Sequence, residues 1–471
     1  MRVLWLTNFC VPQLAEKLGL PQNNKEGWIA GSLDMILNKK REGGLDLELA
    51  VLFPWNSNEE PGKLGEYDGV TYYFFRENSP LMMEPGTREL FYEVLSDFKP
   101  EVIHIFGTEY PHAAAMLETL ALKEIPGLSV DNVLIGMQGV VSECAKHYLD
   151  GIPEDVAKRK TFRDFLKGDG LLEQQKKFKV RATNEMVALL ECGNVTGRTD
   201  FDREYTRKFA RRAKYFHMNE TLRKPFYEAI REDQINEGPA TQSGIEKEGP
   251  ETQPGTEKAG STVTREAHRI FLCQCDYPIK GVHYVIEALP KLLEAYPDLK
   301  VVVCGDNITR HATLKEKIKI SGYGKYQLEL IEKVSKEIGK PAPIEYIGKT
   351  STEDMIKEYR RAGLFLLPST VENSPNALCE AMLLGTPVVA ANVGGVSSVM
   401  KDGEDGYLYE AGSIEALTEA VKKSFEDEKK REEMRLHAQE RAKKAHDPEA
   451  NFERLLEIYR EISGLKTPSE E

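Results

Sequence analysis

The sequence predicts an α/β protein in which two doubly wound domains face each other across a cleft. Its 471 residues exceed what a single ordinary core holds. A polar segment near the middle divides the chain, and after it short apolar runs alternate with helical patterns. That alternation is typical of a parallel sheet covered by helices on both faces.

The first domain is predicted to span residues 1–230. Apolar runs predict its strands, which are separated by longer and less regular connections than in the second half. The expected strands are Val3–Thr7, Leu47–Phe53, Val102–Phe106, Val133–Gly136 and Asn194–Thr196, and a helix is expected near Gly31–Lys39.

Residues 231–263 form the predicted linker. They are rich in Gly, Pro, Glu, Thr and Gln and contain two near-repeats in tandem, which begin at Pro239 and Pro250. Because so polar a segment buries too little apolar surface to offset the entropy of ordering, we expect it to be disordered.

The second domain is predicted to span residues 264–446, with strands and helices in strict alternation. The expected elements are Arg269–Cys275, Tyr284–Ala295, Lys300–Cys304, Tyr326–Glu337, Ile344–Ile347, Thr352–Arg361, Leu364–Leu367, Asn376–Leu384 and Pro387–Ala391. Helical patterns at Ile414–Glu426 and Lys430–Lys444 follow, then a proline break at Pro448 and a last helix over Glu449–Ile462.

Composition excludes several classes of protein. A net charge of -13 argues against a nucleic-acid partner, because binding a phosphate backbone requires a cationic surface. No apolar run approaches the roughly 18 residues of a spanning helix, and the first residues lack the pattern of a signal peptide. We therefore expect a soluble cytoplasmic protein whose seven cysteines are reduced. The one close pair, Cys273 and Cys275, has no neighbouring ligands to complete a metal site.

A local cluster of basic residues runs from Lys158 to Arg181. Solvated faces of helices explain it most simply. The alternative is a peripheral contact with anionic lipid headgroups at the inner face of the membrane, or with a lipid-phosphate acceptor.

The most informative segment follows the predicted strand Leu364–Leu367. In an open parallel sheet, ligands sit beyond the carboxyl ends of strands, and Glu372 stands on such a loop. A helix then starts near Asn376, and its free N–H groups make an anion site. Glu380 lies one turn further on. Two carboxylates that flank a helix N-terminus suit a nucleotide-sugar, although Glu372 as a helix cap and Glu380 as surface charge remain the structural alternative.

This segment resembles the Glu-x7-Glu motif of family-4 retaining glycosyltransferases, which have the GT-B fold: two facing Rossmann-like domains with a donor and acceptor cleft between them. The resemblance implies that Glu372 contacts the donor sugar and that Glu380 holds the nucleotide ribose. It also implies that the backbone around Asn376, Ala377 and Leu378 binds the diphosphate.

The resemblance extends from Phe271 to Glu410 and includes a Lys-Gly element at Lys280 and Gly281. A lysine on this loop can reach a phosphate. The family normally has an arginine five residues earlier, where this chain has Cys275. Arg198, at a strand end of the first domain, is our candidate substitute, and a purely structural ion pair of Arg198 is the alternative.

In the first domain, Gly27 resembles the glycine-rich turn of the family, where a backbone amide approaches the donor phosphate and the acceptor. Many relatives place a histidine where Phe106 stands. Glu109 and His112, at the same strand end, are therefore candidate groups facing the acceptor, and His147 lies on the next strand-end loop; a structural role is the alternative for both histidines. Further patterns, such as Gly197–Asp202, resemble a subgroup of bacterial surface-polysaccharide assembly.

The resemblance implies a hexosyltransferase that acts with retention at the anomeric carbon, through an oxocarbenium-like transition state. Its donor is a nucleotide-sugar, its acceptor a glycan or a lipid-linked group. No Asp-x-Asp motif stands at a strand end, so we expect no metal and no cofactor, with Lys280 and the helix N-terminus stabilising the diphosphate. We also expect residues 447–471 to return to the first domain. The rival readings are a non-catalytic nucleotide-sugar-binding protein and a GT-B epimerase or phosphorylase.

Overall fold

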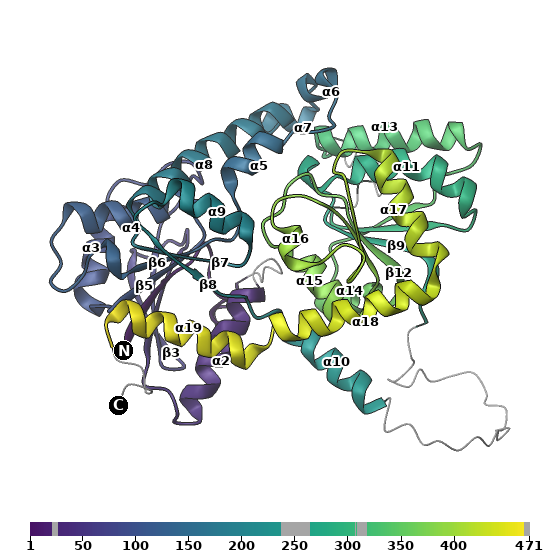
Figure 1. Ribbon diagram of the computed structural model, residues 1–471. Coiled ribbons are helices and arrows are strands. Elements are labelled where there is room, and N and C mark those ends of the chain that lie inside the picture. Colours follow the sequence, from purple (N-terminus) through teal and green to yellow (C-terminus); the bar gives the residue numbers. More distant parts are fainter. Residues whose placement is uncertain (21–26, 237–263, 307, 309–317, 466–471) are drawn as a thin grey trace, which may run out of the picture.

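The structure is a computed structural model that describes residues 1–20, 27–236, 264–306, 308 and 318–465. The described residues form two α/β halves, each built around one sheet (Figure 1). Apolar clusters cover both faces of each sheet. The predicted α/β fold with two doubly wound, Rossmann-like halves is therefore confirmed.

Within the described ranges, the first sheet is eight-stranded, in the order β3-β4-β2-β1-β5-β6-β7-β8. Its strands are β1 (Arg2–Leu6), β2 (Glu48–Pro54), β3 (Gly62–Tyr67), β4 (Val70–Phe75), β5 (Val102–Phe106), β6 (Val133–Gly136), β7 (Asn194–Gly197) and β8 (Lys214–His217). Its helices are α1 (Pro12–Lys17), α2 (Gly27–Arg41), α3 (Thr87–Phe98), α4 (Pro111–Leu122), α5 (Val141–His147), α6 (Glu154–Lys158), α7 (Phe162–Lys167), α8 (Leu171–Glu191) and α9 (Asp200–Phe209). The helix α10 (Lys224–Asn236) follows β8 along the chain but packs into the apolar core of the second half.

The strand β1 shows why such segments read as continuous apolar runs. Successive side chains of a strand point to opposite faces, and here helices cover both. Val3 and Trp5 pack into the cluster on one face, whereas Leu4 and Leu6 pack into the cluster on the other. All four side chains are buried, so polar and apolar residues do not alternate along this strand.

The hairpin of β3 and β4 is an element that we did not predict. These two strands pair antiparallel at the edge of an otherwise parallel sheet. Asp68 and Gly69 connect them, both with positive φ (52° and 73°). Such a two-residue Asp-Gly turn matches the twist of a hairpin.

The second sheet is six-stranded and parallel throughout its described strands, in the order β11-β10-β9-β12-β13-β14. Its strands are β9 (Glu266–Cys273), β10 (Lys300–Cys304), β11 (Ile344–Gly348), β12 (Ala362–Leu367), β13 (Val388–Ala391) and β14 (Tyr407–Tyr409). Its helices are α11 (Val282–Ala295), α13 (Gly322–Glu337), α14 (Thr352–Arg361), α15 (Asn376–Leu383), α16 (Val396–Val399), α17 (Ile414–Glu426) and α18 (Glu428–Ala445). We did not predict β14, and β9 ends two residues before Cys275, which therefore lies in the following loop and not on the strand.

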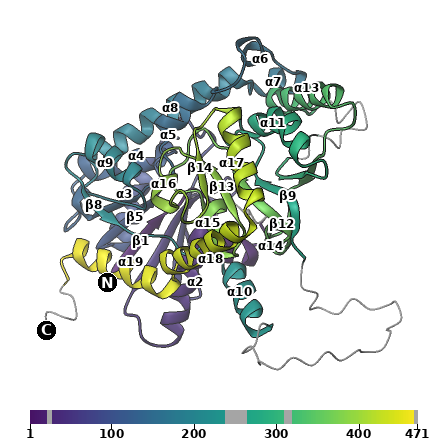
Figure 2. The ribbon, with the colours of Figure 1, turned by 45° about the vertical axis from the view of Figure 1, so that its right-hand side comes forward.

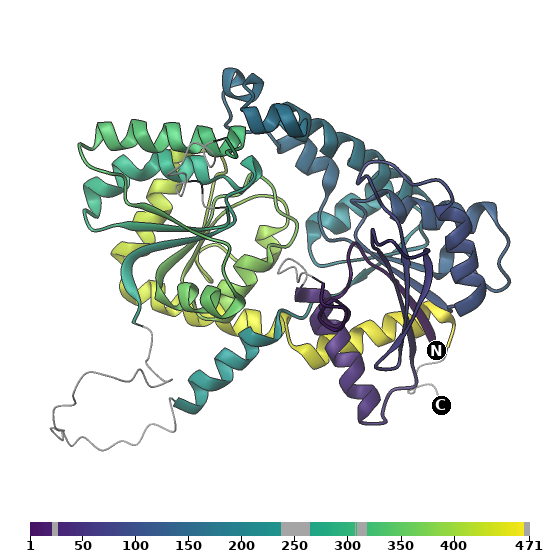
Figure 3. The ribbon, with the colours of Figure 1, turned by 180° about the vertical axis from the view of Figure 1, so that it is seen from behind.

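The last helix, α19 (Pro448–Ser463), crosses back to the first half, as Figures 2 and 3 show from two sides. Phe452 and Leu455 pack into the core beside the first sheet. Trp5 Nε1 donates a hydrogen bond to the hydroxyl of Tyr459 at 2.9 Å. The C-terminal helix thus contributes core residues to the N-terminal half.

The helix α10 continues through Asn236, into the segment that we predicted as linker from residue 231. Residues 237–263, with both near-repeats, lie outside the described residues. The proposed domain limits therefore stay a prediction.

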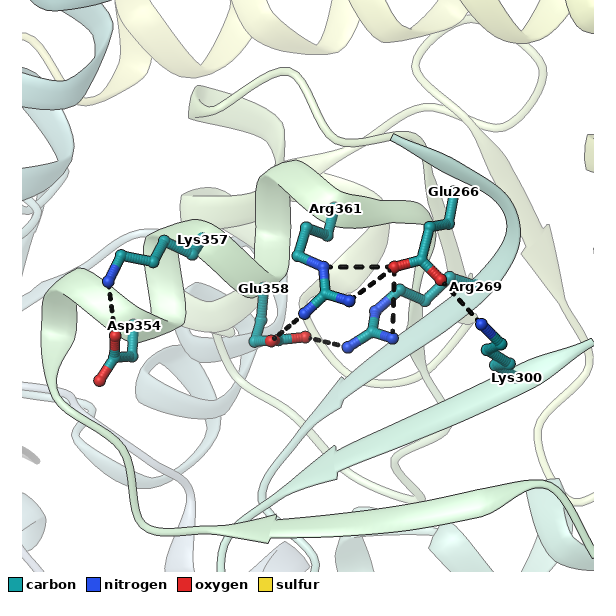
Figure 4. Close-up of polar contacts among 7 residues, drawn as sticks. All are labelled: Glu266, Arg269, Lys300, Asp354, Lys357, Glu358 and Arg361. Atoms are coloured by element: carbon teal, nitrogen blue, oxygen red, sulfur yellow. Dashed lines mark hydrogen bonds and ion pairs between the residues drawn. The ribbon is translucent and has the colours of Figure 1, made fainter. Parts of the chain in front are cut away.

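A network of ion pairs joins α14 to the amino ends of β9 and β10 (Figure 4). Arg361 lies 2.7 Å from Glu266, and Arg269 lies 2.5 Å from Glu358. Lys300 also reaches Glu266, at 3.3 Å. Because ligands of such sheets sit at the carboxyl ends of strands, we assign this network to fixing α14 on the sheet. Among the described helices, none is long and apolar enough to cross a membrane.

Candidate functional site

Glu372 and Lys280 meet at the carboxyl ends of two neighbouring strands. Glu372 lies in the loop after β12, and Lys280 ends the 3-10 helix Pro278–Lys280 after β9. Lys280 Nζ lies 2.7 Å from Glu372 Oε1, which also accepts a hydrogen bond from Ser369 Oγ at 2.7 Å. Because β9 and β12 are parallel neighbours, both loops leave the same edge of the sheet. The fold thus brings together two residues that the sequence assigns to the donor.

The environment keeps Lys280 cationic. Burial lowers its pKa, but the charge and the hydrogen bond of Glu372 outweigh burial, so the pKa is raised above its usual value. The side chains of Lys280 and Glu372 are 21% and 11% exposed. A protonated amine that solvent still reaches can exchange its carboxylate partner for a phosphate.

Two glycines hold the Glu372 loop from opposite sides. A β-carbon on Gly281 would lie 1.8 Å from the carbonyl oxygen of Pro368, and one on Gly394 would lie 1.9 Å from the carbonyl oxygen of Glu372. Both glycines also have positive φ. The space beside each glycine is therefore occupied by the backbone of this loop.

The helix α15 begins at Asn376, with Pro375 as its N-cap residue and no side-chain cap. The amide of Leu378 donates to the carbonyl of Pro375 at 3.0 Å. The side-chain oxygen of Asn376 accepts a hydrogen bond from Arg198 of the first half, also at 3.0 Å. The predicted anion site therefore starts at Asn376 and Ala377, while the amide of Leu378 closes the first turn.

Arg198 is buried between the two halves. Its guanidinium lies 2.7 Å from Glu220, which is the structural ion pair that we gave as the alternative role. Its contact with Asn376 nevertheless places the positive charge at the N-terminus of α15. Arg198 Nε is buried without a hydrogen-bond partner among the described residues.

Glu380 is buried in the second turn of α15, against an arginine that we did not assign to the site. Arg223, which precedes α10, lies 2.7 Å from Glu380 Oε1, and its Nε donates to the same oxygen at 2.8 Å. Tyr359 lies 3.4 Å from the other carboxylate oxygen. Burial raises the pKa of Glu380, and Arg223 opposes that effect. Glu380 is thus not the surface charge of the structural alternative.

Cys275, at the position of the missing arginine, is a buried thiol. Burial raises the pKa of this thiol, and nearby Asp276 adds to the shift. Its sulfur contacts Asp276 at 3.5 Å and the carbonyl oxygen of Asp306 at 3.4 Å. Cys275 therefore supplies no positive charge. Among the described residues, no group of three or more His, Cys, Asp or Glu side chains is arranged to hold a metal ion.

Glu109 and His112 lie close together beyond β5. His112 is fully buried, and its ring nitrogens lie 2.9 Å from Glu77 and 2.9 Å from Asn8. Glu109 Oε2 is a buried oxygen without a hydrogen-bond partner among the described residues. In this structure Glu109 has a carboxylate oxygen to spare, whereas His112 has both nitrogens engaged.

The remaining candidates of the first half lie around the same edge. Phe106 ends β5 and stacks on His104 with ring centroids 3.9 Å apart. His147 is half-buried and lies 2.7 Å from Asp150. Gly27 begins α2, directly after residues outside the described ranges, so its assignment stays a prediction.

Direct hydrogen bonds join the two halves beside the Glu372 loop. Thr199 donates to Asn373 at 2.9 Å, and the amide of Asp200 donates to Ser398 at 3.0 Å. A separate cleft of about 440 Å³ lies between the halves, with Tyr148 on one wall and Tyr277 on the other. Lys280, Glu372 and Glu380 are not among the described residues that line this cleft; Lys280 pairs with Glu372, and Glu380 pairs with Arg223.

The basic cluster at residues 158–181 divides into two parts. Toward its end the cations are engaged internally: Lys177 lies 3.0 Å from Asp169, and Arg181 donates to the carbonyl of Glu109 at 2.9 Å. Toward its start they pair with exposed carboxylates, as Lys158 does with Glu154. Exposed cations nevertheless remain in both parts, among them Lys176 and Lys179 in the second.

Comparison with known proteins agrees with this fold. Residues 269–441 match the family model described as glycosyl transferases group 1. A D-inositol 3-phosphate glycosyltransferase of Corynebacterium urealyticum is 27% identical over 189 residues, which are 40% of this chain and 41% of the relative. The match thus spans about two fifths of that relative's length. The surface-polysaccharide subgroup that we predicted is not what this relative represents, so that assignment stays a prediction.

Solved structures of low sequence identity share the arrangement of the whole chain. Sucrose-phosphate synthase of Thermosynechococcus elongatus has a TM-score of 0.61 at 14% identity, over 98% of this chain and 99% of that one. Anabaena Alr3699/HepE, solved with UDP and glucose, has a TM-score of 0.57 at 16% identity, over 97% and 99%. The chain therefore has the GT-B fold, and its residues 269–441 are similar to the glycosyl transferases group 1.

Proposed function

We propose that this protein is a glycosyltransferase that moves a hexosyl group from a nucleotide-sugar to a glycan or lipid-linked acceptor, with retention at the anomeric carbon. One observation carries the proposal above the others: Lys280, Glu372 and the N-terminus of α15 converge at one edge of the second sheet. A cation, a carboxylate and free amides at one place match the diphosphate and the hydroxyls of such a donor.

The proposed chemistry relies on the leaving group. As the glycosidic bond breaks, negative charge grows on the diphosphate, and donors fixed in advance stabilise it without reorganising. Lys280 supplies a full charge and the amides of Asn376 and Ala377 supply the helix terminus. Glu372 then binds sugar hydroxyls with its carboxylate. With these groups in place we propose transfer without a metal ion or cofactor.

Arg198 is the proposed second cation at the diphosphate. Its guanidinium donates a hydrogen bond to the side chain of Asn376, the first residue of α15. We propose that this charge replaces that of the arginine that the family has where this chain has Cys275. A charge-assisted hydrogen bond contributes about 1.5–3 kcal/mol. An Arg198→Ala protein should therefore bind its donor roughly ten- to a hundred-fold more weakly. Unchanged donor affinity would contradict a role of Arg198 at the diphosphate.

Glu109 is the proposed contact of the acceptor. Its unpartnered carboxylate oxygen lies beyond the end of β5 in the first half. There it could take the proton from the attacking hydroxyl of the sugar acceptor. His112, held by Glu77 and Asn8, fixes this edge rather than offering a free nitrogen. A cytoplasmic position and a role in polysaccharide or glycoconjugate biosynthesis belong to the same proposal.

A non-catalytic nucleotide-sugar-binding protein is the second candidate, because Cys275 and Phe106 stand where relatives have polar groups. Slow hydrolysis of the donor separates the two. Full-length protein is incubated with UDP-, GDP- and ADP-sugars chosen by a thermal-shift screen, and release of the nucleotide is measured. An enzyme releases nucleotide, and Glu372→Gln abolishes the release while Glu345→Gln, an exposed carboxylate on β11, does not. Binding without any release by the unaltered protein, in the presence or absence of acceptors, would favour the binding protein.

A further inference from the structure

The short helix α7 presents three large apolar side chains to solvent. Phe162, Phe165 and Leu166 are 59%, 75% and 66% exposed. Their spacing of three and four residues places them on one face of the helix. We call these three residues the apolar crest.

The opposite side of α7 is anchored in the protein, so the exposure is not that of a loose end. Asp164 is buried and exchanges capping hydrogen bonds with Thr161. A β-carbon on Gly322, which opens α13, would lie 2.9 Å from Asp164 Oδ2. The helix is thus wedged against the second half with its crest turned outward.

Clustering distinguishes the crest from other exposed apolar residues. Single exposed side chains are normal on a protein surface, and Met82 and Leu122 are examples here. Three neighbouring ones on a single turn form a contiguous patch, which typically marks an interaction site. Figure 1 shows α6 and α7 at the end of α8 that lies next to α13 of the second half.

Lysines and arginines flank the crest along the chain, and most of them pair with carboxylates. Residues 158–167 contain five lysines and arginines and one carboxylate, the buried Asp164, in a chain of net charge -13. Lys158 and Lys160 pair with Glu154 and Glu173 in exposed ion pairs. Such pairs contribute little, so these cations can turn to another anion. Lys167 is exposed at the end of α7.

We propose that the apolar crest docks this protein on an anionic lipid bilayer. Phe162, Phe165 and Leu166 enter the boundary of headgroups and acyl chains, and Lys158, Lys160 and Lys167 meet the anionic headgroups. Exposed apolar side chains with lysines on either side along the chain, on a protein of negative net charge, complement a negative interface. This contact needs no donor or acceptor, and therefore stands or falls separately from the proposed function.

Co-sedimentation of the full-length protein with vesicles tests the proposal. Vesicles of phosphatidylcholine with 30% phosphatidylglycerol are compared with pure phosphatidylcholine vesicles at physiological ionic strength. We expect the protein to bind the anionic vesicles at least tenfold more tightly. The triple variant Phe162→Ser, Phe165→Ser and Leu166→Ser should lose at least tenfold of that binding, whereas Leu122→Ser, an equally exposed apolar residue on α4, should lose none.

Two further arms keep the interpretation clear. Lys158→Glu with Lys160→Glu should weaken binding to the anionic vesicles, and added salt should weaken binding by the unaltered protein. The far-UV circular dichroism spectrum and the thermal unfolding midpoint of the triple variant should match those of the unaltered protein, which shows that the variant is folded. Equal vesicle binding by the triple variant and the unaltered protein would overturn the proposal. So would a dimer in sedimentation equilibrium without lipid that the triple variant abolishes, because a second copy would then cover the crest.

Discussion

Replacing Arg223 with methionine should strongly destabilise the second half. Two nitrogens of Arg223 lie 2.7 and 2.8 Å from one oxygen of Glu380, and the two side chains are only 14% and 6% exposed. Breaking such a buried pair leaves an uncompensated carboxylate and costs about 3–5 kcal/mol. The remaining hydrogen bond from Tyr359, at 3.4 Å, is too long to compensate.

The pH dependence of this variant follows from the same carboxylate. Burial already raises the pKa of Glu380, and removal of Arg223 removes the charge that opposes the shift. The folded variant then holds a proton that the unfolded chain releases, so its stability falls as pH rises above the unfolded pKa. We therefore expect the loss relative to the unaltered protein to grow between about pH 5 and pH 8.

Urea-induced unfolding followed by far-UV circular dichroism measures the effect. Tryptophan fluorescence would report on the wrong half, because Trp5, Trp28 and Trp55 all lie in the first. Two comparisons complete the test. Arg223→Met with Glu380→Met should lose less than the single variant, because no buried charge remains. Arg203→Met, which breaks an exposed pair on α9, should change stability by less than about 0.5 kcal/mol. A loss below about 1 kcal/mol in Arg223→Met, or an equal loss in the double variant, would refute the reasoning.

Three other outcomes are expected. Gly281→Ala should lower the free energy of unfolding by about 4 kcal/mol or more in a thermal unfolding assay, because the new β-carbon would meet the backbone of Pro368. Gly339→Ala, at a glycine of similar φ with open space around it, should lower it by about 1–2 kcal/mol. Similar losses in the two variants would contradict this reasoning. Burial lowers the pKa of His104 to about 3, so the free energy of unfolding should fall as pH falls from about 6.5 toward that value. The decrease with pH should be shallower in His104→Leu than in the unaltered protein, and unchanged in His437→Leu, at an exposed histidine. An equal decrease in His104→Leu and the unaltered protein would contradict this prediction. Transferase activity should survive EDTA, and loss with rescue by manganese would rule out the metal-free proposal.

The central strands of the second half were predictable because β12 and β13 are short, fully apolar runs between turn signals, whereas the edge strand β14 was missed. Leu364 and Phe365 pack on opposite faces of β12, so no polar residue interrupts the pattern. The edge hairpin was missed although its Asp68-Gly69 turn is a strong local signal, because Gly62–Tyr67 has no alternation of apolar residues.

The candidate site was predictable in part, for a physical reason. Glu372 and Lys280 each follow a buried strand, and parallel strands bring such loops to one edge. Arg223 carries no such signal: it precedes a helix and lies 157 residues from Glu380 along the chain. Only the packing of α10 against α14 and α15 brings the two together. The apolar crest was likewise hidden, since sequence alone does not show which face of α7 is buried.

A crystal structure of the protein with a bound nucleoside diphosphate addresses the central claim directly. We predict that the diphosphate oxygens lie within hydrogen-bonding distance of Lys280 Nζ and of the amides that open α15 at Asn376 and Ala377, with the Lys280–Glu372 contact exchanged or lengthened. A diphosphate bound elsewhere, with Lys280 and Glu372 still paired as they are here, would contradict the account.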